Sequence, residues 1–128
     1  IVGLTLLGGE PMEPVNQAVL RPFVQKVKDA YPEKNIWCYS GYTFDTDLKE
    51  GGKAYTEDTA PLLSMIDVLV DGEFVEDLKD IRLSFRGSSN QRIIDVKKSL
   101  EEGSVVLALQ DEEEQDTNFG RYREKVFI

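Results

Sequence analysis

The chain has 128 residues, of which 41% are hydrophobic and 30% charged, a size and balance that fit one globular domain with a buried core. The formal net charge of −9 argues against a non-specific nucleic-acid binder, and no apolar run approaches the roughly 20 residues that span a bilayer. Cys38 is the single cysteine and histidine is absent, which excludes an internal disulfide, a Cys/His metal site and serine–histidine or cysteine–histidine catalysis by these residues.

The first third of the chain predicts a strand, a helix and a second strand. The apolar run Ile1–Leu7 is typical of a short buried strand. Apolar residues then recur at helical spacing from Val15 to Val27, with Asn16 as the expected N-cap and Pro22 as a conflict inside the helix. The segment 35–42 (NIWCYSGY) predicts the second strand.

The middle of the chain predicts a loop, a short helix and a third strand. Residues 44–59 are polar and glycine-bearing, and Ala60–Met65 fits one short helix. Ile66–Gly72 (IDVLVDG) is apolar up to Asp71 and predicts the third strand, followed by a turn or short helix at 76–80.

The last third predicts another helix and strand. The helix begins at an N-cap, Ser88 or Ser89, and stops at Gly103. Its apolar positions are Ile93, Ile94, Val96 and Leu100. Residues 104–110 (SVVLALQ) predict a fourth strand. We therefore divide the chain into an ordered part, residues 1–110, and an acidic and polar tail, residues 111–128, whose order the pattern does not determine.

Strands that are continuously apolar and joined by helical crossovers indicate an α/β fold with a parallel sheet covered on both faces. Ligands of such sheets bind at the carboxyl ends of the strands. Three segments directly follow predicted strands: Gly8-Gly9-Glu10, Tyr39-Ser40-Gly41 and Asp71-Gly72-Glu73. We expect them to lie along one edge of the sheet.

The residues in these segments suggest a small-molecule site. Gly8 and Gly9 let backbone groups approach a ligand closely, and Glu10 can hold an ammonium group. Asp71 can accept two hydrogen bonds from a vicinal diol such as a ribose. The alternatives are an ordinary turn for the glycines and a helix cap or solvated loop acid for Asp71.

Other polar and aromatic residues have structural alternatives as well. The polar cluster before the last predicted helix contains Arg86, Ser88, Ser89, Asn90 and Gln91, and plain N-capping would explain it. Cys38 lies in an apolar strand and is expected in the core. The aromatic residues Trp37, Tyr39 and Tyr42 would stack on an adenine or pack in the core.

Taken in order, four segments closely resemble the activating proteins of anaerobic (class III) ribonucleoside-triphosphate reductase. They are 4–11 (LTLLGGEP), 34–45 (KNIWCYSGYTFD), 66–80 (IDVLVDGEFVEDLKD) and 83–100 (LSFRGSSNQRIIDVKKSL). These relatives are radical S-adenosylmethionine enzymes related to pyruvate formate-lyase activase. The resemblance covers residues 1–100 and implies part of a radical-SAM partial (β/α) barrel.

The resemblance implies roles for individual residues. The motif matched by Gly8-Gly9-Glu10 and the following proline receives the amino-acid end of S-adenosylmethionine, and Asp71 falls near the ribose. Tyr39-Ser40 stands where relatives carry an Asp-Thr pair, which implies a ligand contact for Ser40, and Glu73 stands where they carry lysine. The family's C-x3-C-x2-C motif is absent, so we expect a C-terminal portion that has no metal ligands or catalytic residue of its own and is inactive alone.

The resemblance also implies a reaction and its partners. A [4Fe–4S] cluster, whose ligands this chain lacks, reductively cleaves S-adenosylmethionine, and the 5′-deoxyadenosyl radical abstracts hydrogen from a glycine of the reductase large subunit. The expected electron donor is a low-potential protein such as flavodoxin, and the expected location is cytoplasmic. The alternatives are an activase of another glycyl radical enzyme such as pyruvate formate-lyase, a non-catalytic relative that binds cofactor or partner, and an unrelated flavodoxin-like nucleotide binder.

Overall fold

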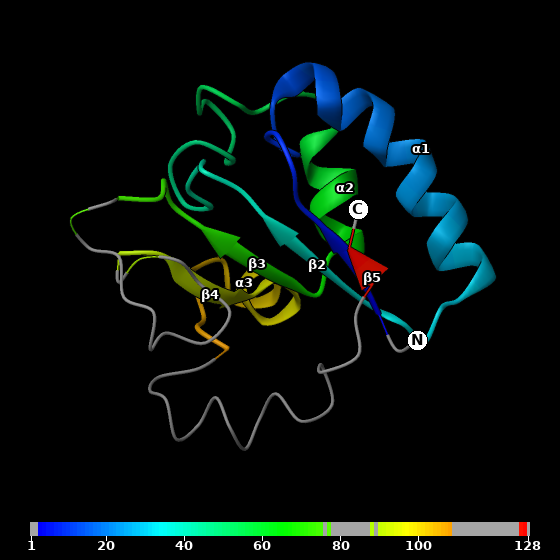
Figure 1. The fold of residues 1–128 in the computed structure, drawn as a ribbon. Helices are drawn as coiled ribbons and strands as arrows, with labels where there is room; N and C mark the ends of the chain where they lie inside the picture. The colour runs from blue at the N-terminus through cyan, green and yellow to red at the C-terminus, as the bar shows by residue number, and fades with distance from the viewer. Residues whose placement is uncertain (1–2, 76, 78–87, 89, 109–125, 128) are drawn as a thin grey trace.

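The computed structural model describes residues 3–75, 77, 88, 90–108 and 126–127, which form an α/β domain (Figure 1). The elements in chain order are β1 (Gly3–Leu6), α1 (Pro14–Ala30), β2 (Asn35–Tyr39), α2 (Thr59–Met65), β3 (Val68–Asp71), β4 (Arg92–Asp95), α3 (Val96–Glu102) and β5 (Val126–Phe127). None of the helices described has the length and apolar character needed to cross a lipid bilayer.

The strands form one five-stranded sheet in the order β4-β3-β2-β1-β5. β1, β2, β3 and β5 run parallel to one another, with Leu6 paired with Cys38 and Tyr39 with Val70. β4 pairs antiparallel with β3, so the expectation of an all-parallel sheet is wrong at this edge. In Figure 1 β5 lies beside β1 at the opposite edge.

The predicted elements of the first two thirds are present with shifted boundaries. α1 begins at Pro14, because proline suits the first helical position, and Glu13 precedes it without a side-chain cap. Asn16 is therefore not the N-cap. Its side-chain amide donates instead to the carbonyl oxygen of Glu10, at 2.8 Å. Pro22 lies inside α1, so the helix continues through the proline that the sequence placed in conflict with it.

The predicted helix starting at Ser88 or Ser89 is wrong in its first half. Ile93 and Ile94 belong to β4, and the helix begins only at Val96. Its N-cap is Asp95, whose Oδ1 accepts a hydrogen bond from the Lys98 N–H at 3.0 Å. Gly103 ends it in the left-handed conformation, as predicted.

The predicted strand at 104–110 is also wrong for its described residues, 104–108. They make one isolated antiparallel bridge, between Leu107 and Ile94, with two backbone hydrogen bonds beside it: Asp95 N–H donates to the Val106 carbonyl, and Ala108 N–H donates to the Ile93 carbonyl. Residues 109–125 and 128, which include most of the predicted tail at 111–128, lie outside the described residues. So do most of the predicted turn at 76–80, Arg86 and Ser89.

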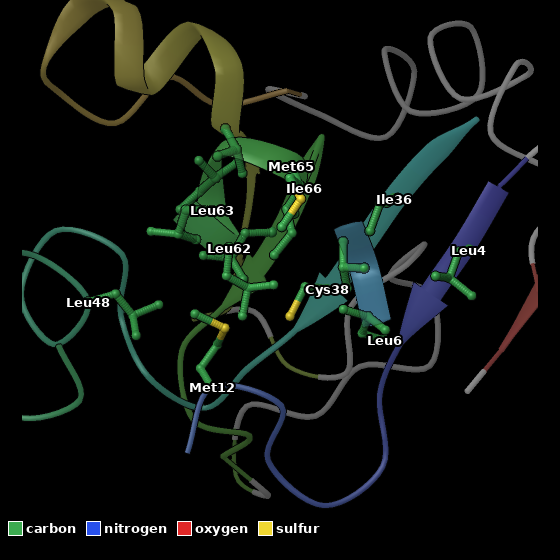
Figure 2. Close-up of a cluster of buried hydrophobic side chains, with 14 of the residues drawn as sticks. Leu4, Leu6, Met12, Ile36, Cys38, Leu48, Leu62, Leu63, Met65 and Ile66 are labelled. Carbon is green, nitrogen blue, oxygen red and sulfur yellow. The ribbon is translucent and has the colours of Figure 1, made fainter. Parts of the chain in front are cut away.

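The main core lies between one face of the sheet and the helices. Alternate strand residues point to this face, including Leu6 on β1 and Cys38 on β2, where they meet Leu62 of α2 and Met12 of the turn after β1 (Figure 2). Residues of α1, α2 and α3 all belong to this cluster, so the three helices pack on one face rather than on both.

The opposite face of the sheet carries a smaller cluster. Trp37, Val68, Val70 and Ile93 are buried there, with Tyr39 packed against them. Cys38 and Trp37 are thus both core residues, on opposite faces of β2, and neither is open to a ligand.

Candidate functional site

The turns that follow β1, β2 and β3 lie along one edge of the sheet, as the sequence predicts for three parallel neighbours. Ser40 extends the pairing of β2 with β3, because its N–H donates to the Val70 carbonyl at 3.0 Å. We call Gly8, Gly9, Glu10, Ser40 and Gly41 the strand-end site, since hydrogen bonds join its two turns directly.

The two glycines after β1 adopt backbone conformations that side chains disfavour. Gly8 has φ +90° and Gly9 has φ +58°, and both are exposed. Nothing lies within 4 Å of a Cβ built on Gly9, so its glycine identity reflects backbone conformation rather than crowding. The turn therefore presents bare backbone to solvent directly beside Glu10.

The Glu10 carboxylate accepts three hydrogen bonds from the described part of the chain. Its Oε2 accepts from the Ser40 hydroxyl at 2.7 Å and from the Met12 N–H at 3.0 Å, and its Oε1 accepts from the Gly41 N–H at 2.6 Å. An ionised carboxylate has about four acceptor positions, so one position on Oε1 is left for a ligand. The backbone of Glu10 is held as well, through its carbonyl bond from Asn16.

Gly41 is a residue of this site that the sequence analysis did not assign. A Cβ on Gly41 would lie 3.2 Å from the Glu10 Oε1 atom and 3.9 Å from the Glu73 Cα. A side chain here would crowd the oxygen that still has a free acceptor position. The signal in the sequence was a glycine directly after Ser40 at a strand end.

Tyr42 connects the β2 turn to the start of α1. Its hydroxyl donates to the Glu13 Oε2 atom at 2.7 Å, and its N–H donates to the Ser40 hydroxyl oxygen at 3.1 Å. The hydrogen bond to Glu13 raises the pKa of Tyr42 above its ordinary value. Tyr42 packs at the edge of the main core, with Lys53 over its ring.

Asp71 lies at the same edge of the sheet but is engaged within the protein. Its residue surface is 0% exposed, and its carboxylate accepts from Arg92 Nη2 at 2.6 Å, Arg92 Nε at 2.9 Å and Phe44 N–H at 2.7 Å. Arg92 also bonds Asp45 at 2.8 Å, which lowers the pKa of Asp45. Because the Asp71 carboxylate is fully buried, a ribose would reach it only if one of the residues that cover it moved.

The polar segment before β4 fastens the turn after β3, and it does not cap a helix. Asn90 Nδ2 donates to the Glu73 carbonyl at 2.8 Å, and Gln91 Nε2 donates to the Gly72 carbonyl at 3.0 Å. Ser88 is buried and bonds Asn90 Oδ1 at 2.6 Å. Glu73 is an exposed residue whose Cα, not its carboxylate, lies near Gly41.

The fold and this turn chemistry define a class: an α/β domain with a candidate small-molecule site at the carboxyl ends of parallel strands. Residues 1–94 match the family described as "4Fe-4S single cluster domain", and the chain belongs to that family.

The relatives found among curated proteins share one name, "Anaerobic ribonucleoside-triphosphate reductase-activating protein", which confirms the resemblance predicted from the sequence. The protein of Haemophilus influenzae is 45% identical over 91 residues, covering 71% of this chain and 54% of that protein. That of Pasteurella multocida is 47% identical over 93 residues (71% and 54%), and that of Enterobacteria phage T4 is 39% identical over 93 residues (73% and 53%). The chain therefore spans about half the length of these relatives. No solved structure matches it.

The residues of this chain do not fit a [4Fe–4S] cluster. The sequence contains one cysteine, and Cys38 is fully buried in the main core. Burial, and next the nearby charge of Glu10, raise the pKa of the Cys38 thiol well above its ordinary value, whereas cluster ligands are thiolates. Among the described residues no group of three acidic, cysteine or histidine side chains is placed to hold a metal ion.

Proposed function

We propose that this chain acts within a glycyl radical activase of anaerobic ribonucleotide reductase. In this reaction one electron enters the sulfonium of S-adenosylmethionine and its S–C5′ bond breaks, giving methionine and a 5′-deoxyadenosyl radical. That radical takes a hydrogen atom from a glycine of the reductase, leaving 5′-deoxyadenosine and a glycyl radical. The relatives' shared name and the 4Fe–4S family description support the proposal.

The part of this activity that we assign to the described residues is binding of the amino-acid end of S-adenosylmethionine. The observation that carries it is the free acceptor position on Glu10 Oε1, beside an exposed glycine turn. An ammonium donor placed there would form a charge-assisted hydrogen bond with a carboxylate already held in place. Backbone groups of Gly8 and Gly9 would approach the same end of the ligand.

The ribose contact of Asp71 remains a proposal with a defined requirement. The carboxylate is fully buried and bonded to Arg92 and Phe44, so a ribose hydroxyl would reach it only if one of these neighbours moved aside. The Phe44 N–H belongs to a loop residue and is the donor that can withdraw without leaving the Asp71 charge unpaired.

Other parts of the proposal concern the protein around this chain. We propose that the sheet forms part of a partial (β/α) barrel, that the electron comes from a low-potential donor such as flavodoxin, and that the protein acts in the cytoplasm. The chain supplies no cluster ligands, so we expect it to yield no 5′-deoxyadenosine from S-adenosylmethionine and a reductant on its own.

Binding measurements on the chain with a Glu10→Gln variant test the assignment. We expect S-adenosylmethionine to bind about 10- to 100-fold more weakly to the variant, because a hydrogen bond to a charged group contributes about 1.5–3 kcal/mol. Binding of 5′-methylthioadenosine, which lacks the amino-acid end, should be unchanged. The matched control is Glu33→Gln, an exposed acid in the turn between α1 and β2.

Unchanged affinity of the Glu10→Gln variant for S-adenosylmethionine would remove Glu10 from the site. An equal loss for both ligands would mean that the substitution disturbs the whole region, and the assignment of Glu10 to the amino group would then be rejected.

A further inference from the structure

We propose that Ser40 is a positioning residue, which aims the Glu10 carboxylate at the amino group of the ligand and does not itself contact the ligand. This inference rests on the proposed function, because it concerns how the strand-end site holds the amino-acid end of S-adenosylmethionine.

The hydrogen bonds of the Ser40 hydroxyl exclude a second donor role. Its single proton is donated to Glu10 Oε2 at 2.7 Å, and its oxygen accepts from the Tyr42 N–H at 3.1 Å. A hydroxyl has one proton to donate, so Ser40 cannot donate to a ligand while it holds Glu10. Ser40 is also only 5% exposed, which leaves little surface for a ligand to touch.

Ser40 is itself held firmly. Its backbone N–H donates to the Val70 carbonyl at 3.0 Å, which continues the β2–β3 pairing beyond the end of the strand. A hydroxyl fixed by the sheet can therefore hold a carboxylate from the neighbouring turn in one orientation. The same bond ties the turn after β1 to the turn after β2.

The consequence concerns the rotation of the Glu10 carboxylate. Ser40 and Met12 occupy Oε2, and Gly41 occupies one acceptor position of Oε1, so rotation of the carboxylate group would break bonds at both oxygens. A Cβ on Gly41 would lie 3.2 Å from Oε1, so the absence of a side chain there leaves this oxygen uncrowded. Loss of the Ser40 bond would leave one donor on each oxygen, from Met12 and Gly41, and would weaken the restraint on rotation of the carboxylate.

A comparison of two ligands, one with the amino group and one without it, distinguishes a role of Ser40 in orienting Glu10 from a merely structural role. A residue that orients Glu10 affects only ligands that carry the amino group. A residue that stabilises the whole edge of the sheet would affect every ligand bound there. S-adenosylmethionine and 5′-methylthioadenosine differ in the amino-acid end, so their ratio of affinities reports on the orientation of Glu10.

The experiment measures binding of both ligands to the chain and to three variants. Ser40→Ala should weaken S-adenosylmethionine about threefold to tenfold, the effect of one ordinary hydrogen bond, and leave 5′-methylthioadenosine within twofold. Ser40→Thr retains the hydroxyl and should bind both ligands as the unsubstituted chain does. Ser64→Ala removes an exposed hydroxyl that bonds within α2 and serves as the control.

An equal loss for both ligands in Ser40→Ala, no loss for either, or a Ser40→Thr variant as weak as Ser40→Ala would overturn the proposal. The Glu10→Gln measurement separates this failure from that of the proposed function. If Glu10→Gln weakens S-adenosylmethionine and Ser40→Ala does not, the site stands and only the role of Ser40 is wrong.

Discussion

Cys38 shows how one residue couples the core to the strand-end site. It lies on β2, two residues before Ser40, and its thiol is fully buried among apolar side chains. Burial raises its pKa most, and the negative charge of Glu10 raises it further. The folded protein therefore keeps this thiol protonated at pH values at which an unfolded chain would ionise it.

The pH dependence of stability follows from this difference. Below the ordinary pKa of 9.0 both states keep the proton, and above it only the unfolded chain releases the proton, so rising pH favours unfolding. Between pH 8 and pH 10 we expect the stability of the chain to fall by about 1.4 kcal/mol more than that of Cys38→Ala. Urea unfolding at a series of pH values measures this difference in the free energy of unfolding.

The control is Val24→Ala, a buried truncation without a titratable group. Its free energy of unfolding should be lower than that of the unsubstituted chain by the same amount at every pH. If the free energy of unfolding of Cys38→Ala falls with pH in parallel with that of the unsubstituted chain, the prediction is wrong.

Single residues of the site were predictable only as candidates. The sequence indicated Gly8, Gly9 and Glu10 because they follow an apolar run, but it could not show that Ser40 and Gly41 bond to the Glu10 carboxylate. Those contacts join residues about thirty positions apart and depend on the β1–β2 register. Gly41 was not assigned for the same reason.

At the scale of elements, the main wrong prediction was a helix where the structure has β4. Ile93, Ile94, Val96 and Leu100 fit the spacing of a helix, and the strand that contains the first two has only four residues, too few to show alternation. What places Ile93 and Ile94 in a strand is their pairing with Val70 and Leu69. Such pairing is a tertiary effect that local spacing does not report.

An ion pair between the buried carboxylate of Asp71 and the partly exposed guanidinium of Arg92 joins β3 to β4. Asp71 has a side chain 1% exposed and is paired with Arg92 across the two strands. Replacement of Arg92 by methionine would leave a buried carboxylate without its cation, and we expect a loss of about 3–5 kcal/mol in the free energy of unfolding. Denaturant unfolding measures the loss.

The control is Arg21→Met, which removes the more exposed ion pair with Asp58 and should cost no more than about 1 kcal/mol. The double variant Arg92→Met with Asp71→Leu removes both charges and should recover much of the stability. If Arg92→Met costs no more than Arg21→Met, the ion pair does not hold β4 in place.

At the scale of the whole molecule, the arrangement of β1, β2 and β3 was predicted correctly, because continuous apolar strands separated by helices favour parallel pairing. Parallel pairing places the three turns at one edge without knowledge of any side-chain contact. The sequence did not reveal that the helices share one face, since each helix has an apolar side that fits either face.

The central claim is that the strand-end site binds the amino-acid end of S-adenosylmethionine. Backbone amide chemical shifts of the chain, recorded by NMR during titration with S-adenosylmethionine and separately with 5′-methylthioadenosine, test it most directly. We predict that S-adenosylmethionine shifts the amides of Gly8, Gly9 and Gly41 most, that 5′-methylthioadenosine leaves these three nearly unchanged, and that α3 responds to neither. Shifts confined to α3, or Gly8, Gly9 and Gly41 amides that respond equally to both ligands, would contradict the claim.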